Sequence, residues 1–182
     1  MTMTDTAPRR RAWRGPALLS YGFRPFFFLA ALCAALLVGL WVPWFLGFLA
    51  LPSAFSPVDW HAHELLFGYV PAVIAGFLLT AVPSWTSRPP VMGWPLAGLV
   101  CLWLLARAVV ALSAGMPPAI VLAGCVAFPL ALAGVVGREL VLARNWRNLK
   151  VLAVLGLIIA AQMLFHYEAA RYGRSEYGAR LA

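Results

Sequence analysis

The sequence predicts an all-α fold, a polytopic membrane bundle of about five transmembrane helices. Of its 182 residues, 63% are hydrophobic and only 11% are charged, and the mean hydropathy is +0.86. Soluble domains contain about 25% charged residues and about 45–50% apolar ones. A helix that crosses a bilayer needs about 20 mostly apolar residues. Five stretches of the chain meet that requirement, so we expect a protein embedded in lipid.

The five expected spans cover residues 25–50, 62–82, 93–113, 117–137 and 149–168. Their breaks fall at Leu51-Pro52-Ser53, Pro83-Ser84, Pro89-Pro90, Pro117-Pro118 and the polar stretch 138–148. Prolines at 43, 71 and 129 lie within spans, where they free backbone carbonyls and are expected to bend the helices. The chain therefore divides into a basic segment (1–24), a five-helix membrane domain (25–168) and a polar tail or start of a further span (169–182).

The basic residues predict the orientation. Ten of the 14 lie in the N-terminal segment and in the second and fourth connections: Arg9, Arg10, Arg11, Arg14, Arg24, Arg88, Arg138, Arg144, Arg147 and Lys150. Three others, Arg171, Arg174 and Arg180, lie in the tail on the opposite side. Because basic loops stay on the cytoplasmic side, we expect a multi-pass protein of the bacterial inner membrane with a cytoplasmic N-terminus. Its net charge of +8 is explained by orientation and not by nucleic-acid binding.

The run Trp60-His61-Ala62-His63-Glu64 opens the second span and is the most informative feature of the chain. Ionisable groups near hydrocarbon are costly and usually mark a functional site. The third histidine of the chain, His166, lies near the end of the last span. The expected topology places all three histidines at the outer ends of their spans, together with Gln162 and Arg107, so the polar groups share one depth.

The geometry of this run leaves the ligand set open. In a helix, His63 points roughly 200° away from His61, so the two could share a metal only if His61 precedes the helix. Glu64 starts a row of small residues at four-residue spacing, Gly68, Ala72, Gly76 and Thr80. Such a row lets a neighbouring helix approach closely. We therefore expect Glu64 to lie against a neighbour and to be hydrogen-bonded or directed at a ligand, because an unpaired carboxylate there is costly.

On the last span, Gln162 and His166 lie four residues apart and share one helix face. Imidazole is a common ligand of haem iron, copper and zinc, and a nearby amide can orient such a ligand. Three histidines at a common depth favour metal or cofactor ligation over single interfacial histidines. Two interpretations stay open for Arg107: it neutralises a carboxylate, Glu64 or a haem propionate, or it extends to the outer interface.

Other sites are not indicated. Cys33, Cys101 and Cys125 lie singly within apolar stretches with no CxxC pair, which is typical of buried small hydrophobes. The basic stretch before the first span resembles a signal-peptide n-region, but the span is too long and no cleavage site follows. No phosphate loop, GxSxG or HExxH motif occurs.

The motifs resemble the N-terminal half of the NnrS family. They are Gly22-Phe23-Arg24-Pro25-Phe26-Phe27, the run 60–64 followed by Phe67-Gly68, the stretch 75–86, Arg147-Asn148-Leu149 and Leu164-Phe165-His166. The resemblance covers residues 18–168 and implies an inner-membrane protein that contains haem and copper and is linked to nitric oxide and nitrosative stress. It makes His61, His63 and His166 the expected metal ligands, and it assigns no reaction. Arg24 belongs to a matching motif, and the shared depth adds Arg107, Glu64 and Gln162 as expected site residues, with Arg107 expected to contact the cofactor.

Family members are longer and carry a second half with further histidines. The resemblance therefore implies either a truncated or split member that needs a second-half subunit, or a homo-oligomer. Two other functions are alternatives to haem and copper binding. A transporter or proton-conducting subunit would use a Glu64–His61 relay, and an assembly subunit would use the small-residue row to dock a partner.

Overall fold

The computed structural model describes residues 13–172 and residue 178, and in this part of the chain every regular element is helical. The main helices are α1 (Phe23–Phe45), α2 (Pro57–His63), α3 (Val70–Thr86), α4 (Trp94–Ala111), α5 (Pro118–Leu142) and α6 (Lys150–Tyr172). Two 3₁₀ turns, η1 (Ala17–Leu19) and η3 (Trp146–Asn148), precede α1 and α6, and a π-helical turn, η2 (Glu64–Tyr69), joins α2 to α3. The all-α prediction is confirmed.

Five helical segments are long and apolar enough to cross a membrane, because α2, η2 and α3 form one continuous segment (Pro57–Thr86). The others are α1, α4, α5 and the segment Trp146–Tyr172. Many large apolar side chains on the outer surface are exposed, among them Phe28, Leu36, Leu105 and Leu157, as expected where lipid covers the protein. The chain is therefore a multi-pass membrane protein.

The second segment begins earlier than the sequence suggested. Ser56 caps α2, its hydroxyl oxygen accepting a hydrogen bond from the Asp59 backbone N–H at 3.1 Å, and Pro57 occupies the first helical position. Both features favour a helix start. The run 60–64 thus lies inside a helical segment instead of at its mouth, so His61 and His63 do project from different sides.

The predicted break at 138–148 was wrong in its first part, because α5 continues to Leu142. Arg138 and Glu139 belong to its last turns, where the Glu139 carboxylate accepts hydrogen bonds from Arg138 and Arg88. These ion pairs satisfy the charges that the sequence pattern assigned to a loop. Pro83, expected as a break, lies inside α3, which ends at Thr86 before Ser87 in the left-handed conformation.

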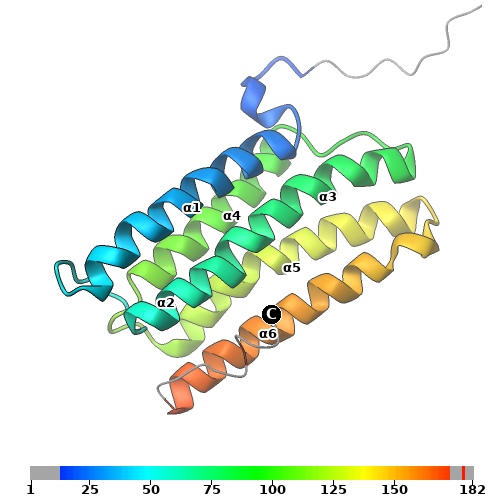
Figure 1. Cartoon of the computed structure of the whole chain (residues 1–182). Coiled ribbons are helices and arrows are strands. Elements are labelled where there is room, and N and C mark those ends of the chain that lie inside the picture. Colours follow the sequence, from blue (N-terminus) through cyan, green and yellow to red (C-terminus); the bar gives the residue numbers. More distant parts are fainter. Residues whose placement is uncertain (1–12, 173–177, 179–182) are drawn as a thin grey trace, which may run out of the picture.

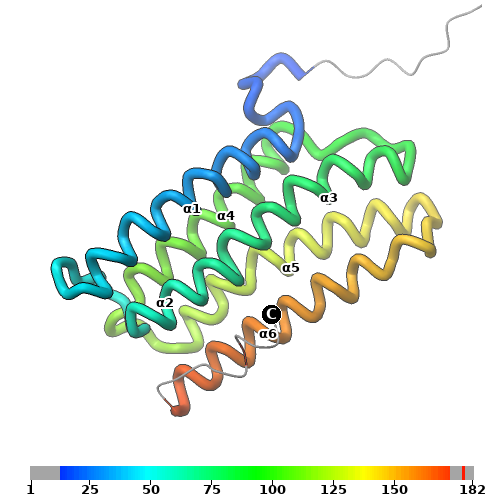
Figure 2. Tube along the Cα trace, in the orientation of Figure 1, coloured from blue at the N-terminus to red at the C-terminus, as the bar shows by residue number. Residues whose placement is uncertain are grey.

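The helices alternate in direction and form an elongated bundle (Figures 1 and 2). α1 packs against α3, α3 against α5, and α5 lies between α4 and α6. α6 is the outermost helix in the view of Figure 1 and packs chiefly against α5. This alternation places α2 and the first turns of α5 at the same end of the bundle as the last turns of α4 and α6. This end carries the candidate site.

The small-residue row of the second span serves two neighbours. A Cβ atom on Gly76 would collide with the Phe27 ring of α1, and one on Gly68 would collide with the Arg107 guanidinium of α4. Ala72 between them is fully buried. The expected close approach is present, and at Gly68 it admits a charged side chain.

Candidate metal centre

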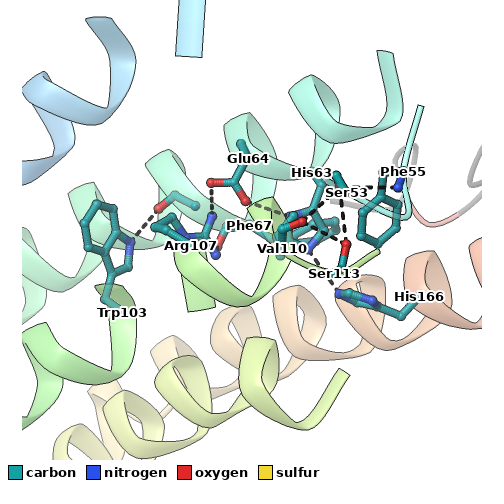
Figure 3. Close-up of polar contacts among 11 residues, drawn as sticks. Ser53, Phe55, His63, Glu64, Phe67, Trp103, Arg107, Val110, Ser113 and His166 are labelled. Carbon is teal, nitrogen blue, oxygen red and sulfur yellow. Dashed lines mark hydrogen bonds and ion pairs between the residues drawn. The ribbon is translucent and has the colours of Figure 1, made fainter. Parts of the chain in front are cut away.

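Two imidazoles face each other in the interior of the bundle. His63 is the last residue of α2, His166 lies on α6, and their Nε2 atoms are 3.1 Å apart (Figure 3). His63 is fully buried and His166 is 6% exposed. The pair joins two segments that are 103 residues apart in the sequence.

Cys125 of α5 completes a three-residue cluster with this pair. One ligand atom from each of His63, Cys125 and His166 lies within 4.8 Å of the other two. All three residues are buried. Two imidazole nitrogens and a thiol form a donor set that suits copper and zinc.

Phenylalanine rings surround the histidines. The Phe55 ring stacks on His63 with centroids 5.7 Å apart, and Phe67 and Phe165 each lie 5.3 Å from the His63 ring. Phe55 also meets His166 edge-on at 5.6 Å. These rings exclude water from the imidazoles and restrict their rotation, so the orientation of the pair is set by packing.

The Glu64 carboxylate orients His63. Its Oε1 lies 3.1 Å from His63 Nδ1, and its Oε2 accepts a hydrogen bond from Arg107 Nη1 at 2.9 Å. Glu64 is 3% exposed, so the guanidinium compensates a charge that would otherwise be buried alone. With Nδ1 directed at a carboxylate, His63 presents Nε2 to His166, and a carboxylate on the other ring nitrogen is the usual support of a metal-ligating histidine.

Two side chains of α4 contact backbone carbonyls of the π-helical turn η2. Pro71 has no N–H, so it cannot donate the α-helical hydrogen bond to the Phe67 carbonyl, and Arg107 Nη2 lies 3.4 Å from that oxygen. The Gly68 carbonyl accepts a hydrogen bond from the Trp103 indole at 2.9 Å. Trp103 and Arg107 lie one turn apart on α4 and so satisfy carbonyls of the widened turn. π-Turns often occur at functional sites.

Two serines fix the loop that carries Phe55. Ser53 Oγ donates to the Val110 carbonyl at 2.9 Å (Figure 3). The Ala54 N–H donates to Ser113 Oγ at 2.8 Å. Ser113 is fully buried just after α4. The loop before α2 is therefore tied to the end of α4, and Phe55 is held against both histidines.

The structure separates His61 from the other two histidines. Its ring stacks on Trp41 of α1, with centroids 4.3 Å apart and 24° between the planes, and its buried Nδ1 has no partner among the described residues. Of the other expected residues, Arg107 contacts Glu64, which agrees with one of its two interpretations. Gln162 is buried one turn before His166. Arg24 lies at the other end of α1, where its Nη1 donates to the Ala17 carbonyl at 3.0 Å.

Sequence reasoning missed Cys125. It interpreted each cysteine as a small buried hydrophobe, because a lone cysteine in an apolar helix has no spacing pattern that marks a ligand. The sequence contained one usable signal: the start of the fourth span was expected at the same end as the histidines. Which face of that helix meets them is decided by packing.

The residues fit a single metal ion better than a haem between the two histidines. Two ligands of one ion at about 2.0–2.1 Å each are compatible with nitrogens 3.1 Å apart. Imidazoles on opposite sides of a haem iron would need about 4 Å at the same bond lengths, with space for the porphyrin between them. The phenylalanine packing around His63 leaves no such separation.

The fold and site together define a class: a polytopic membrane protein with a buried His–Cys cluster at one end of its helical bundle. A comparison with protein families matches residues 17–182 to the family described as NnrS protein. The chain belongs to the NnrS family, as its motifs indicated. No curated protein and no solved structure matches the chain in the corresponding searches.

Proposed function

We propose that this chain is an inner-membrane protein that binds copper between His63, Cys125 and His166 and takes part in the handling of nitric oxide. The observation that carries the proposal is the cluster itself, whose three ligand atoms lie within 4.8 Å of one another in the interior of the bundle. Thiol and imidazole ligands suit copper in both of its common oxidation states. The link to nitric oxide rests on membership of the NnrS family.

The chain's own residues prepare this site. Glu64 accepts the His63 Nδ1–H, which leaves Nε2 free to bind a metal, and Arg107 neutralises Glu64. Phe55, Phe67 and Phe165 exclude water. Bound copper would supply a redox-active centre to which a small diatomic molecule can coordinate.

Haem is the second cofactor that the family resemblance implies, and His61 is the histidine we propose for it. His61 is partly exposed and faces away from the copper cluster, against Trp41. A second copy of the chain or a second-half subunit would supply the remaining haem contacts. We also propose that the N-terminus is cytoplasmic, because the basic residues concentrate on that side; reporter fusions to both termini test it.

The test is metal analysis and a pyridine haemochrome spectrum of purified protein from cells supplied with copper and haem. We expect copper in the wild type and its loss from His63→Ala, His166→Ala and Cys125→Ser. His61→Ala should retain copper and lose haem. Cys101→Ser, which changes an exposed thiol, is the matched control for Cys125→Ser. Wild-type protein without copper would rule out the proposal.

A second candidate is proton conduction, favoured by the series of contacts from Arg107 through Glu64 and His63 to His166. The relay would run through His63, since His61 contacts Trp41 instead of Glu64. Proton flux in proteoliposomes that persists without copper and is lost in Glu64→Gln would favour this function. Absence of flux in copper-free wild type would exclude it.

A further inference from the structure

Gln162 is a buried polar side chain that the proposed copper site does not use. It is 1% exposed, and neither its Nε2 nor its Oε1 has a hydrogen-bond partner among the described residues. An unpaired amide in an apolar environment costs several kcal/mol. The packing does not require a polar side chain at this position, because the neighbours of Gln162 on the buried face of α6 include the apolar residues Ile158, Ala161 and Phe165.

The position of Gln162 relates it to the metal cluster. It precedes His166 by one helical turn, and both belong to the buried side of α6. Residues four apart lie on one helix face, about 6 Å apart along the axis. α6 packs chiefly against α5, the helix that carries Cys125. Gln162 therefore lies on the buried side of α6, one helical turn from a residue of the cluster.

We infer that Gln162 hydrogen-bonds a small anionic or dipolar molecule that coordinates to the metal held by His63, Cys125 and His166. The side-chain N–H would donate to an electronegative atom of that ligand. Because Gln162 and His166 are only one helical turn apart along α6, we expect this ligand to be small, a molecule of two or three atoms. The inference rests on the proposed copper site. It adds that the Gln162 amide favours small ligands that can accept a hydrogen bond.

Azide is the probe, added to the full chain loaded with Cu(II) in detergent. Its affinity is measured from the azide-to-copper charge-transfer band, and the copper content of each sample is determined in parallel. Gln162→Met keeps the side-chain volume and removes the hydrogen bond. We expect unchanged copper content, azide binding weakened about three- to tenfold and a shifted azide stretching frequency. Met163→Leu, which changes the exposed neighbour, should match the wild type.

The outcomes separate the two proposals. Copper-loaded Gln162→Met with wild-type azide affinity and stretching frequency overturns the role of Gln162 and leaves the copper site standing. Wild-type protein that binds no copper overturns both. If Gln162→Met does not fold, Gln162→Asn, whose amide is one methylene shorter, should weaken azide binding in the same direction, and wild-type binding there would also overturn the inference.

Discussion

Two glutamates at opposite ends of the bundle each form an ion pair with arginine, yet their roles differ. Glu139 accepts hydrogen bonds from Arg88 and Arg138 on its two oxygens. The Arg88 and Arg138 side chains are 35% and 68% exposed, so solvent screens this cluster. Both carboxylate oxygens are occupied by cations, and the contact with Arg88 links the connection after α3 to α5.

Glu64 uses only one oxygen for an arginine and directs the other to an imidazole. The Arg107 side chain is 13% exposed and the Glu64 side chain 4%. The arginine compensates the charge, while the second oxygen orients His63 toward His166 and Cys125. The comparison teaches that a carboxylate–arginine pair is structural when both oxygens meet cations, and can support a site when one oxygen is left for a ligand-bearing residue.

Removing the two carboxylates gives the largest expected contrast. Glu64→Gln leaves Arg107 buried without a counter-charge and should lower the free energy of unfolding by about 3–5 kcal/mol. Glu139→Gln affects a solvent-screened cluster and should cost about 1 kcal/mol. Thermal unfolding in detergent measures both. The double variant Glu64→Leu with Arg107→Leu should recover most of the loss, and equal effects of the two single Gln variants would contradict the comparison.

Copper should stabilise one end of the bundle only. At a free copper concentration of about 100 times the dissociation constant, binding to the folded state adds about 2.7 kcal/mol. The shift in unfolding temperature should occur in wild type and Glu139→Gln and be absent from His63→Ala and His166→Ala. A shift of wild-type size in His166→Ala would show that the metal binds elsewhere.

Gly68→Ala tests whether close packing admits Arg107 to Glu64. The added methyl group would collide with the guanidinium, and the strain should cost about 1–3 kcal/mol. Gly134→Ala is the control, because nothing lies within 4 Å of a Cβ atom there, and alanine at an exposed helix position should stabilise by about 0.5–1 kcal/mol. If the unfolding midpoints of Gly68→Ala and Gly134→Ala shift in the same direction by similar amounts, the steric explanation is refuted.

The smallest effects concern carbonyl acceptors at the two ends. Trp103→Phe leaves the buried Gly68 carbonyl without its 2.9 Å indole donor and should cost about 1 kcal/mol. Asn145→Ala removes the 2.8 Å bond to the Trp85 carbonyl, which is only partly buried, and should cost less because water can replace the donor. Denaturation of both variants under the same condition measures the loss of unfolding free energy in each. A larger loss in Asn145→Ala than in Trp103→Phe would argue against burial as the cause.

Much of the fold followed from local sequence. Apolar length predicted five spans, and Ser56-Pro57 contained the signal for the earlier start of α2, although the expected boundary ignored it. The end of α5 was misjudged because Arg138 and Glu139 were counted as loop charges, whereas their ion pairs allow the helix to continue. The contact of Glu64 with a neighbouring helix was expected from burial cost, but its partner was left open between alternatives.

The sequence by itself determined that this chain is a multi-pass helical protein, because bilayer length and apolar composition are properties of consecutive residues. Its short motifs, and not its composition, indicated the NnrS family. It also placed three histidines toward one end of the bundle by counting spans. Only the tertiary structure decided that His63 meets His166 and Cys125 while His61 meets Trp41. Helix rotation and packing control those contacts, and they depend on side chains far apart in the sequence, such as the Arg107 guanidinium that fits only because residue 68 is glycine.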